Sequence, residues 1–265
     1  MYPIQVSIIT VGMNHLSYLK NLLYSIYQIE QNISFEMIYV DNCSIDGSID
    51  FIKKEYPQVR ILRNEKPQGF GENNNKGVLA ASGKYIAIIN PDIVLAPNSL
   101  KQLYDYAESE QDWGILVPQL LNPDGSTQHS IRGYITPQIL LNRFLTKGND
   151  KTANKKVERY LCKDLDTNSI QPVNWAIGAA LFLKKDFYAH LGGFDQDYFL
   201  YMEDEDLCLR SWKNDKPVIY IPSSVMTHNH LRGSSKLGKK TFMHLKSMFT
   251  FFKKHGLNIK DYANS

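Results

Sequence analysis

The chain has 265 residues, of which 43% are hydrophobic and 22% are charged, and its formal net charge at pH 7 is +3. These fractions exclude a disordered tail, a collagen-like fibre and a small disulfide-stapled scaffold. The nearly balanced charge gives no support for nucleic-acid binding. The three cysteines, Cys43, Cys162 and Cys208, lack the C-x-x-C spacing and cannot all pair, which predicts reduced thiols.

The first hundred residues alternate between strand-like and helix-like patterns. Short apolar, β-branched runs predict strands at residues 6–11, 37–40, 59–62 and 85–89. Apolar residues at helical spacing and capping residues predict helices between these strands, over 15–29, through 49–53 and over 69–81. Alternating apolar strands and helices predict an α/β fold, with a mostly parallel central sheet covered by helices on both faces.

The second half of the chain is less regular. Strands are predicted at 113–120, at 172–183 with an interruption at 178–180, and as two short strands around Pro222 within 218–226. Helices are predicted over 203–213 and 242–252. The polar stretch 147–169 shows little periodicity and is expected to be a mobile connection.

The sequence shows no signal-peptide pattern and no apolar run of the ~18 residues that a membrane span needs, so we expect a cytoplasmic protein. The C-terminal segment combines a basic set with an apolar set: Lys236, Lys239, Lys240, Lys246, Lys253 and Lys254 with Phe242, Leu245, Met248, Phe249, Phe251 and Phe252. This pattern is typical of a helix that lies peripherally on the anionic inner face of a membrane. Packing on the core with a solvated basic face is the alternative.

Ligands of parallel α/β sheets bind beyond the carboxyl ends of the strands. Asp41 ends the second predicted strand, and Asn90-Pro91-Asp92 ends the fourth. A carboxylate at Asp92 suits Mg²⁺ or Mn²⁺, which complete their shells with water and substrate phosphates. Asp41 could accept a hydrogen bond from a nucleobase or a ribose. Both motifs are also good turn formers, so ordinary turns remain the alternative.

Four consecutive acids, Glu203 to Asp206, open the helix predicted over 203–213. The helix dipole favours acids in a first turn, yet their crowding would raise the proton affinity of at least one, as a general base requires. Asp206 could instead pair with Arg210 on the helix face. His228 and His230 end the last strand and could complete a metal site, or could be ordinary surface histidines.

Five motifs occur in a fixed order along the chain. They are Val-Asp-Asn-x-Ser-x-Asp-Gly-Ser at 40–48, Gly-Phe-Gly followed by Asn-Asn at 69–75, Asn-Pro-Asp at 90–92, Gly-Gly-Phe-Asp at 192–195 and Tyr-x-Glu-Asp-x-Asp-Leu-Cys-x-Arg at 201–210. Together they resemble the inverting family 2 glycosyltransferases of the GT-A fold. Within that family they are most similar to bacterial rhamnosyltransferases of O-antigen and capsule assembly.

The resemblance covers roughly residues 4–235 and implies a GT-A Rossmann-like fold. It implies a glycosyltransferase domain at 1–235, whose nucleotide-sugar half is 1–125 and whose acceptor half is 126–235. The basic amphipathic helix would then occupy 236–265. Two departures stand out, since Asn90 replaces the first acid of the family's Asp-x-Asp, and Gly12-Met13 stand where Thr-Tyr is common.

The same resemblance implies roles for individual residues. The nucleotide sugar would be bound by Thr10, Val11, Gly12, Asn14, Asp41, Gly69, Phe70, Asn75, Asn90 and Asp92. Asp92 and His228 would bind Mg²⁺ or Mn²⁺, with His230 as a competitor. The sugar and acceptor pocket would be shaped by Trp175, Gly178, Ala179 and Glu203. Asp204 is predicted to be the general base, with Glu203 as the fallback.

The activity implied is inverting transfer of a sugar from a nucleoside diphosphate donor to a hydroxyl group. The best match is L-rhamnose from dTDP-rhamnose, moved to a saccharide or a polyprenyl-linked saccharide in surface polysaccharide synthesis. A UDP-hexose donor remains open. A sugar nucleotidyltransferase and a nucleotide-sugar-binding module without catalysis are further alternatives. The nucleotidyltransferase lacks support, because such enzymes normally carry a Gly-rich, basic loop soon after the first strand and this sequence has none there.

Overall fold

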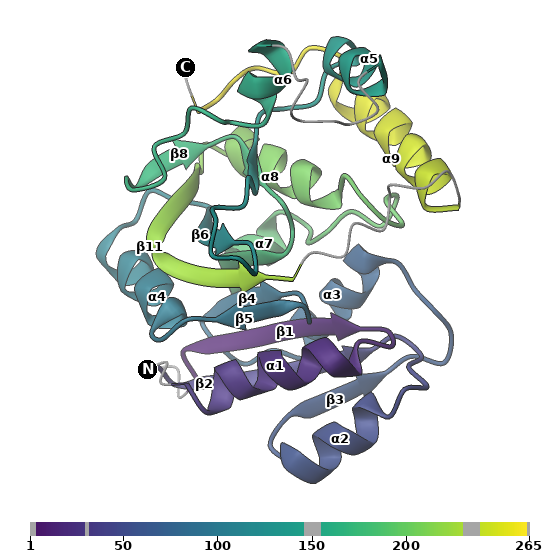
Figure 1. Cartoon of the computed structure of the whole chain (residues 1–265), viewed down its shortest axis with the longest axis vertical. Helices are drawn as coiled ribbons and strands as arrows, with labels where there is room; N and C mark the ends of the chain where they lie inside the picture. The colour runs from purple at the N-terminus through teal and green to yellow at the C-terminus, as the bar shows by residue number, and fades with distance from the viewer. Residues whose placement is uncertain (1–3, 30–31, 146–154, 230–238, 264–265) are drawn as a thin grey trace.

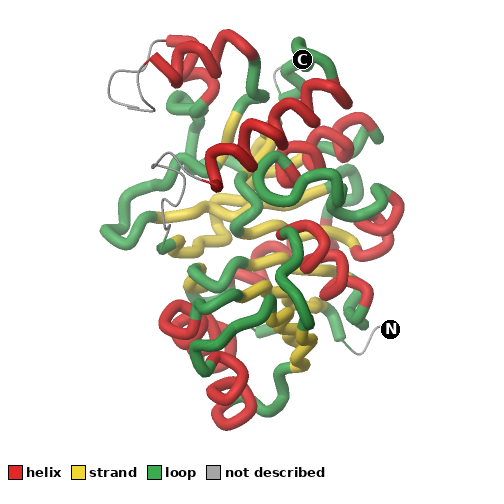
Figure 2. Tube along the Cα trace, turned by 90° about the vertical axis from the view of Figure 1, so that its right-hand side faces the viewer, coloured by secondary structure: helices red, strands yellow, loops and turns green. Residues whose placement is uncertain are grey.

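The computed structural model describes residues 4–29, 32–145, 155–229 and 239–263. Figure 1 shows the N-terminal strands and helices at one end of the molecule, and the C-terminal helix beside helices from the middle of the chain at the other. Figure 2 shows strands running between layers of helices.

A mixed sheet organises the molecule, with strands in the order β3-β2-β1-β4-β10-β6-β11-β5 and with β8 paired to β11. β1 to β4 are mutually parallel, whereas β10 runs antiparallel to both β4 and β6, and β11 runs parallel to β6. The strands are β1 Val6–Gly12, β2 Phe35–Asp41, β3 Arg60–Arg63, β4 Tyr85–Ile89, β5 Ile93–Leu95, β6 Ile115–Leu121, β8 Gln171–Val173, β10 Ala180–Lys184 and β11 Val218–His228. A small second sheet pairs β7, Ile131–Arg132, with β9, Trp175–Ala176.

Helices cover both faces of the sheet, as expected from its apolar strands. Neighbouring strand residues such as Ile8 and Ile9 are both fully buried but belong to separate cores on opposite faces. One core includes residues of α1 Leu16–Tyr27, α2 Ser48–Glu55 and α4 Ser99–Ser109. The other includes residues of α3 Phe70–Leu79, α7 Lys185–His190, α8 Glu203–Lys213 and α9 Lys239–His255. The predicted fold class is therefore confirmed.

Three predicted stretches of the second half differ from their prediction. Residues 147–169 were expected to be mobile, but Lys155–Tyr160 form α6, which packs against α5, Pro137–Leu145, with Val157 buried. This helix has only six residues, too few to show a helical periodicity in the sequence. Residues 147–154 of the stretch that was expected to be mobile lie outside the described residues. Residues 218–226 belong to one strand rather than two, because a bulge between Ile221 and Val225 accommodates Pro222, which has no N–H. The stretch 172–183 divides into β8, β9 and β10.

The C-terminal helix α9 joins the same core as α8 through its buried residues Met248 and Phe251, and His255 near its end contacts Asp206 of α8. Ser247 donates a hydrogen bond to the carbonyl of Leu200 at 2.9 Å. Within the described ranges, no helix is long and apolar enough to cross a membrane.

Candidate active site

The strand directions bring several of the predicted residues to one edge of the sheet. β1, β2 and β4 are parallel, so Gly12, Asp41 and the Asn90–Asp92 turn lie at their shared carboxyl edge. β10 runs the opposite way and therefore begins there. The N–H of Asn90 donates to the carbonyl of Ala179 at 2.9 Å, and the N–H of Gly178 donates to Oδ2 of Asp204 at 2.8 Å. A hydrogen-bonded path thus joins the turn of Asp92 to the acidic helix.

Asp92 and His228 face each other at this edge. The Nε2 of His228 lies 3.5 Å from Oδ2 of Asp92, and the N–H of Asn229 donates to the Asp92 carbonyl at 2.8 Å. His228 is buried, and its Nδ1 lies 2.7 Å from Oε1 of Gln128. Oδ1 of Asp92 is also buried, and no hydrogen-bond partner for it exists among the described residues.

This donor set fits a divalent cation. Mn²⁺ and Mg²⁺ need only one or two protein ligands when substrate phosphates and waters complete the shell. The Asp92 carboxylate offers those ligands together with the imidazole, since its Oδ1 has no described hydrogen bond and its Oδ2 lies near Nε2 of His228. The part of the chain that the structure describes contains no cluster of three or more His, Cys, Asp or Glu side chains able to hold a metal. His230, the predicted competitor, lies outside the described residues.

The four acids at the start of α8 divide into two functional classes. Asp206 pairs with Arg210 at 2.6 Å and lies 2.7 Å from Nε2 of His255 on α9. Glu205 is buried and accepts a hydrogen bond from the N–H of Ile135 at 2.9 Å, which ties α8 to the segment after β7. These two acids hold the fold together, and the alternative pairing of Asp206 with Arg210 is realised.

Glu203 and Asp204 form the second class. Asp204 is half-buried, and its carboxylate accepts hydrogen bonds from the N–H groups of Gly178 and Glu205 at 2.8 and 2.9 Å. Burial raises its pKa, while those hydrogen bonds and the nearby Arg132 oppose the rise. Glu203 is buried, and its Oε2 finds no hydrogen-bond partner in the described ranges. Burial, and then the charge of Asp204, raise the pKa of Glu203.

The backbone before α8 is strained. Tyr201 and Met202 both adopt left-handed conformations, with φ of 69° and 72°, which cost non-glycine residues of order 1–3 kcal/mol each. The segment is held by the hydrogen bond from Ser247 to Leu200 and by a ring contact between Tyr201 and His244 of α9. The left-handed conformations of these two residues set the direction in which α8 begins, and therefore the positions of Glu203 and Asp204. The sequence has no glycine at positions 201 and 202 that would have indicated a left-handed backbone.

The predicted nucleotide side is built from β1 and β2. Gly12 stands opposite Asp41 in the parallel register, and a Cβ at Gly12 would lie 2.1 Å from the hydroxyl of Tyr39. Asp41 is fully buried, and its Oδ2 lies 3.7 Å from Nε of Arg63 and has no hydrogen bond among the described residues. The buried Oγ1 of Thr10 is likewise without a described hydrogen-bond partner.

The remaining predicted residues of this side have structural contacts. Val11 packs partly buried against the core on the α3 face. Asn14 accepts a hydrogen bond from the N–H of Ile45 at 2.8 Å, which ties the loop after β1 to the loop after β2. Gly69 lies so close to the segment that precedes α8 that a Cβ would meet the Phe199 carbonyl oxygen at 2.9 Å. The N–H of Phe70 donates to that same carbonyl at 3.1 Å.

Two predicted binding residues have their polar atoms engaged within the protein. The amide of Asn75 donates to the Phe194 carbonyl at 2.8 Å and accepts from the Phe194 N–H at 2.9 Å. The indole N–H of Trp175 donates to the Gly133 carbonyl at 2.7 Å. Asn75 therefore fixes the loop that precedes α8, and Trp175 fixes β9. Their predicted binding roles stay predictions.

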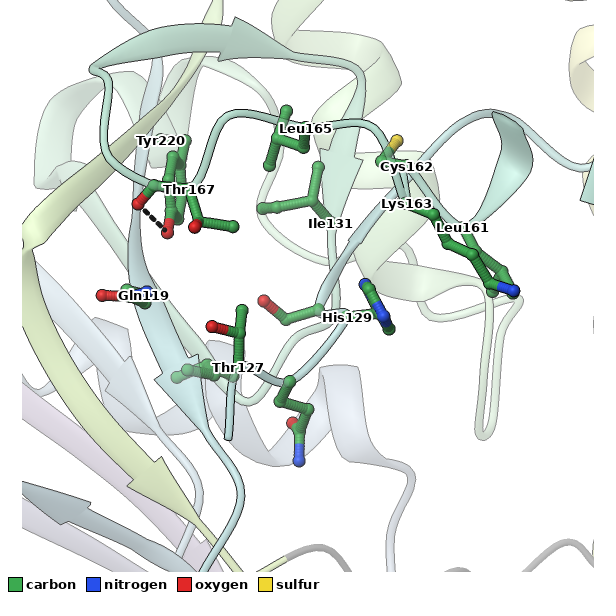
Figure 3. Close-up of a pocket in the computed structure, with 13 residues that line it drawn as sticks. Gln119, Thr127, His129, Ile131, Leu161, Cys162, Lys163, Leu165, Thr167 and Tyr220 are labelled. Atoms are coloured by element: carbon green, nitrogen blue, oxygen red, sulfur yellow. Dashed lines mark hydrogen bonds between the residues drawn. The ribbon is translucent and has the colours of Figure 1, made fainter. Parts of the chain in front are cut away.

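Two hollows in the structure are not lined by the acids of this edge, although Gln128, the partner of His228, lines the smaller one. The smaller, about 30 Å³, has room for only one or two waters and is lined by β6 and residues 127–131 and 161–167. Figure 3 shows Gln119 and Tyr220 on one side of it and Cys162 and Lys163 on the other. The larger, about 490 Å³, lies between α5, α6 and the C-terminal segment. Neither is lined by Asp41, Asp92 or Asp204.

Comparison with known proteins shows the family to which the chain is related. Residues 7–159 match the model of "Glycosyl transferase family 2". The chain is 28% identical over 211 residues to an N-acetylglucosaminyl-diphospho-decaprenol L-rhamnosyltransferase of Mycobacterium tuberculosis, covering 76% of this chain and 68% of the relative. It is 27% identical over 265 residues to the rhamnosyltransferase WbbL of Escherichia coli, covering 93% of this chain and 92% of the relative.

The fold is shared with solved glycosyltransferases. The crystal structure of GalNAc-T7 with UDP, GalNAc and Mn²⁺ superposes with a TM-score of 0.68 at 16% sequence identity. The match covers 94% of this chain but only 48% of that one, so the chain spans about half the length of this neighbour.

Proposed function

The chain belongs to glycosyl transferase family 2, and we propose that it is an inverting transferase that moves a sugar from a nucleoside diphosphate donor to a hydroxyl group. One observation carries the proposal. The path from Asp92 through Asn90, Ala179 and Gly178 joins Asp92, the carboxylate proposed to bind a cation, to Asp204, the candidate base. In-line displacement needs the leaving diphosphate and the incoming hydroxyl at such a shared site.

Asp204 is the proposed base. Its carboxylate is half-buried and is stabilised by two N–H groups, whereas Glu203 is buried and keeps its proton to higher pH next to the Asp204 charge. Asp204 therefore ionises first. It takes the proton of the acceptor hydroxyl as that oxygen bonds to the anomeric carbon. The bond from that carbon to the diphosphate breaks, its electron pair leaves with the diphosphate, and the configuration inverts.

Asp92 and His228 are the proposed ligands of a divalent cation. When bound, Mn²⁺ or Mg²⁺ would neutralise negative charge on the diphosphate. Asp41 and Thr10 have buried oxygens without hydrogen-bond partners in the described part of the chain, and they are proposed to bind the nucleoside. Gly178 and Ala179 hold Asp204 and the Asn90 turn in place, which sets where the acceptor can approach.

The proposed donor is dTDP-L-rhamnose, and the proposed acceptor is a saccharide linked to a polyprenyl lipid. The rhamnosyl group and the lipid-linked acceptor follow from the names of the two relatives, which are rhamnosyltransferases, one of them named for a diphospho-decaprenol. The dTDP carrier is the one that the family resemblance implies. A UDP-hexose is the competing donor, because the structural neighbour was solved with UDP and GalNAc. A nucleotidyltransferase would join a sugar phosphate to a nucleotide rather than release a nucleoside diphosphate.

Release of nucleoside diphosphate from a donor panel, with and without acceptor, tests this function. We expect acceptor-dependent release with dTDP-rhamnose and Mn²⁺, and we expect Asp92→Ala to remove the metal-dependent part. If only UDP-hexoses release nucleoside diphosphate in an acceptor-dependent way, a UDP-hexose replaces dTDP-rhamnose as the proposed donor. Failure of every donor to bind or react would contradict the proposed function.

We further propose that α9 rests on an anionic membrane surface. Its outer face exposes Phe242, Leu245 and Phe249, which are 73%, 57% and 73% accessible, and Lys246 and Lys253 are exposed on the same helix. Apolar side chains flanked by lysines match the boundary between headgroups and acyl chains. A lipid-linked acceptor would be presented at that surface.

Flotation with vesicles containing phosphatidylglycerol tests this contact. The double variant Phe242→Ser/Phe249→Ser should lose flotation, while Tyr24→Ser, which alters an aromatic residue 59% accessible on α1, should keep it. Equal flotation of all three proteins would show that α9 is not the contact.

A further inference from the structure

The loop that follows β6 carries a chain of side-chain hydrogen bonds that leads to His228. Its turn is Asn122-Pro123-Asp124-Gly125, closed by a hydrogen bond from the Gly125 N–H to the Asn122 carbonyl at 2.9 Å. Gly125 has φ of +81°, and proline at the second position is typical of such a turn. The N–H of Gln128 then donates to the Leu120 carbonyl at 2.9 Å, which returns the chain along β6.

The hydrogen bonds of this series all have donors and acceptors that can be assigned in one consistent direction. The hydroxyl of Ser126 donates to Oδ1 of Asp124 at 2.6 Å, and this hydrogen bond lowers the pKa of Asp124, so its carboxylate acts only as an acceptor. The single hydroxyl proton of Ser126 is then used. Nδ2 of Asn122 must therefore be the donor across the 2.9 Å to Oγ of Ser126.

The donors and acceptors can be assigned in the same way as far as the imidazole ring of His228. With its NH₂ group turned to Ser126, Asn122 presents Oδ1 to Nε2 of Gln128 at 3.0 Å. Gln128 therefore presents Oε1 to Nδ1 of His228 at 2.7 Å. A carbonyl oxygen can only accept, so Nδ1 carries the hydrogen. In the neutral imidazole Nε2 then holds the lone pair, and Nε2 is the atom 3.5 Å from Oδ2 of Asp92.

We propose that Gln128 is a positioning residue that holds His228 in its Nδ1–H tautomer and so presents the Nε2 lone pair, beside Asp92, to a divalent cation. The Asn122–Ser126 loop fixes the orientation of the Gln128 amide. The inference rests on the proposed function for the presence of the cation, and it deepens that function by assigning the outer partner of the metal-binding histidine. Two electron-pair donors that face each other are held favourably only when a cation or a proton lies between them.

Mn²⁺ binding, followed by the electron paramagnetic resonance signal of free Mn²⁺ in the presence of nucleoside diphosphate, tests the proposal without turnover. Gln128→Leu should weaken binding by about 10- to 100-fold, as loss of such an outer partner typically does. Gln128→Glu keeps the acceptor and should retain binding. Gln119→Leu is the matched control, because Gln119 lines the small cavity beside the same loop, and it should bind Mn²⁺ like the unaltered protein.

The tautomer is measured independently in the metal-free, unaltered protein by long-range proton–nitrogen correlation of the His228 ring, at a pH where the ring is neutral. The proposal requires the hydrogen on Nδ1. A hydrogen on Nε2, unchanged Mn²⁺ affinity in Gln128→Leu, or equal weakening in Gln128→Leu and Gln128→Glu would each overturn it. Absence of sugar transfer in a protein that passes these tests would contradict the proposed function alone.

Discussion

The N–H of Gly178 donates to Oδ2 of Asp204 across 2.8 Å, two residues before β10 begins and next to Ala179, whose carbonyl accepts from the N–H of Asn90. The two residues are 26 positions apart in the chain. This hydrogen bond gives the carboxylate a fixed orientation at the edge of the sheet. It is the contact through which the strand and the acidic helix form one site.

Gly178→Ala should impair turnover while leaving nucleotide binding in place. A Cβ at Gly178 would lie 3.1 Å from Cβ of Asp204, so the carboxylate must move. Small misplacements of a reacting group can cost about 100-fold in rate. Steady-state kinetics and donor titration measure the two effects separately. Gly133→Ala is the control, because its Cβ would meet only ordinary contacts at 3.5 Å and beyond, and full activity in Gly178→Ala would contradict the account.

Glu203→Gln should stabilise the protein, and more so as the pH rises. Burial raises the pKa of Glu203 in the folded protein above its unfolded value, so folding favours the protonated carboxyl. Below the unfolded pKa, roughly 4.3, both states are protonated and the pH has little effect. Above it the unfolded state releases its proton first, and the stability of the unaltered protein falls.

Thermal unfolding from pH 4 to pH 8 measures this difference. The gap in Tm between Glu203→Gln and the unaltered protein should widen toward high pH. A gap that does not depend on pH would mean that Glu203 ionises as readily in the folded as in the unfolded chain.

Asp206→Asn should destabilise the fold by roughly 3 kcal/mol, because Arg210 and His255 would lose their shared buried carboxylate. Asp105→Asn is the matched control. It breaks a pair with the same i,i+4 spacing, but Lys101 and Asp105 are 40% and 50% exposed, so the expected loss is about 0.5 kcal/mol or less. Urea unfolding compares the two, and equal losses would show that Asp206 is no anchor of α8 and α9.

Much of the fold follows from local patterns in the sequence. The apolar strands β1 to β4 and the helices between them predict a parallel sheet that is covered by helices. Because the carboxyl ends of parallel strands share one edge of a sheet, the sequence also predicts that Asp41 and Asp92 lie at the same edge. The antiparallel insertion of β10 between β4 and β6 could not be predicted, since it depends on pairing between segments about ninety residues apart.

The acids of the candidate site can be named from the sequence, but most of their contacts cannot. The spacing of Asp206 and Arg210 allowed their pairing to be named as an alternative. The contacts of Asp206 with His255 and of Glu205 with the N–H of Ile135 join distant segments and have no local signature. Tyr201 and Met202 adopt left-handed backbone without a glycine, held by contacts from α9. The hydrogen bond of Gln128 to His228 joins residues 100 positions apart, and no local pattern indicates it.

The most direct test of the central claim is the single-turnover rate of sugar transfer in Asp204→Asn, with saturating donor, acceptor and Mn²⁺. The amide is nearly isosteric and can still accept the Gly178 hydrogen bond, but it cannot take a proton. The account predicts that donor binding is retained and that the rate falls by about 10²- to 10⁴-fold, the usual contribution of a general base. Transfer at the unaltered rate would contradict it.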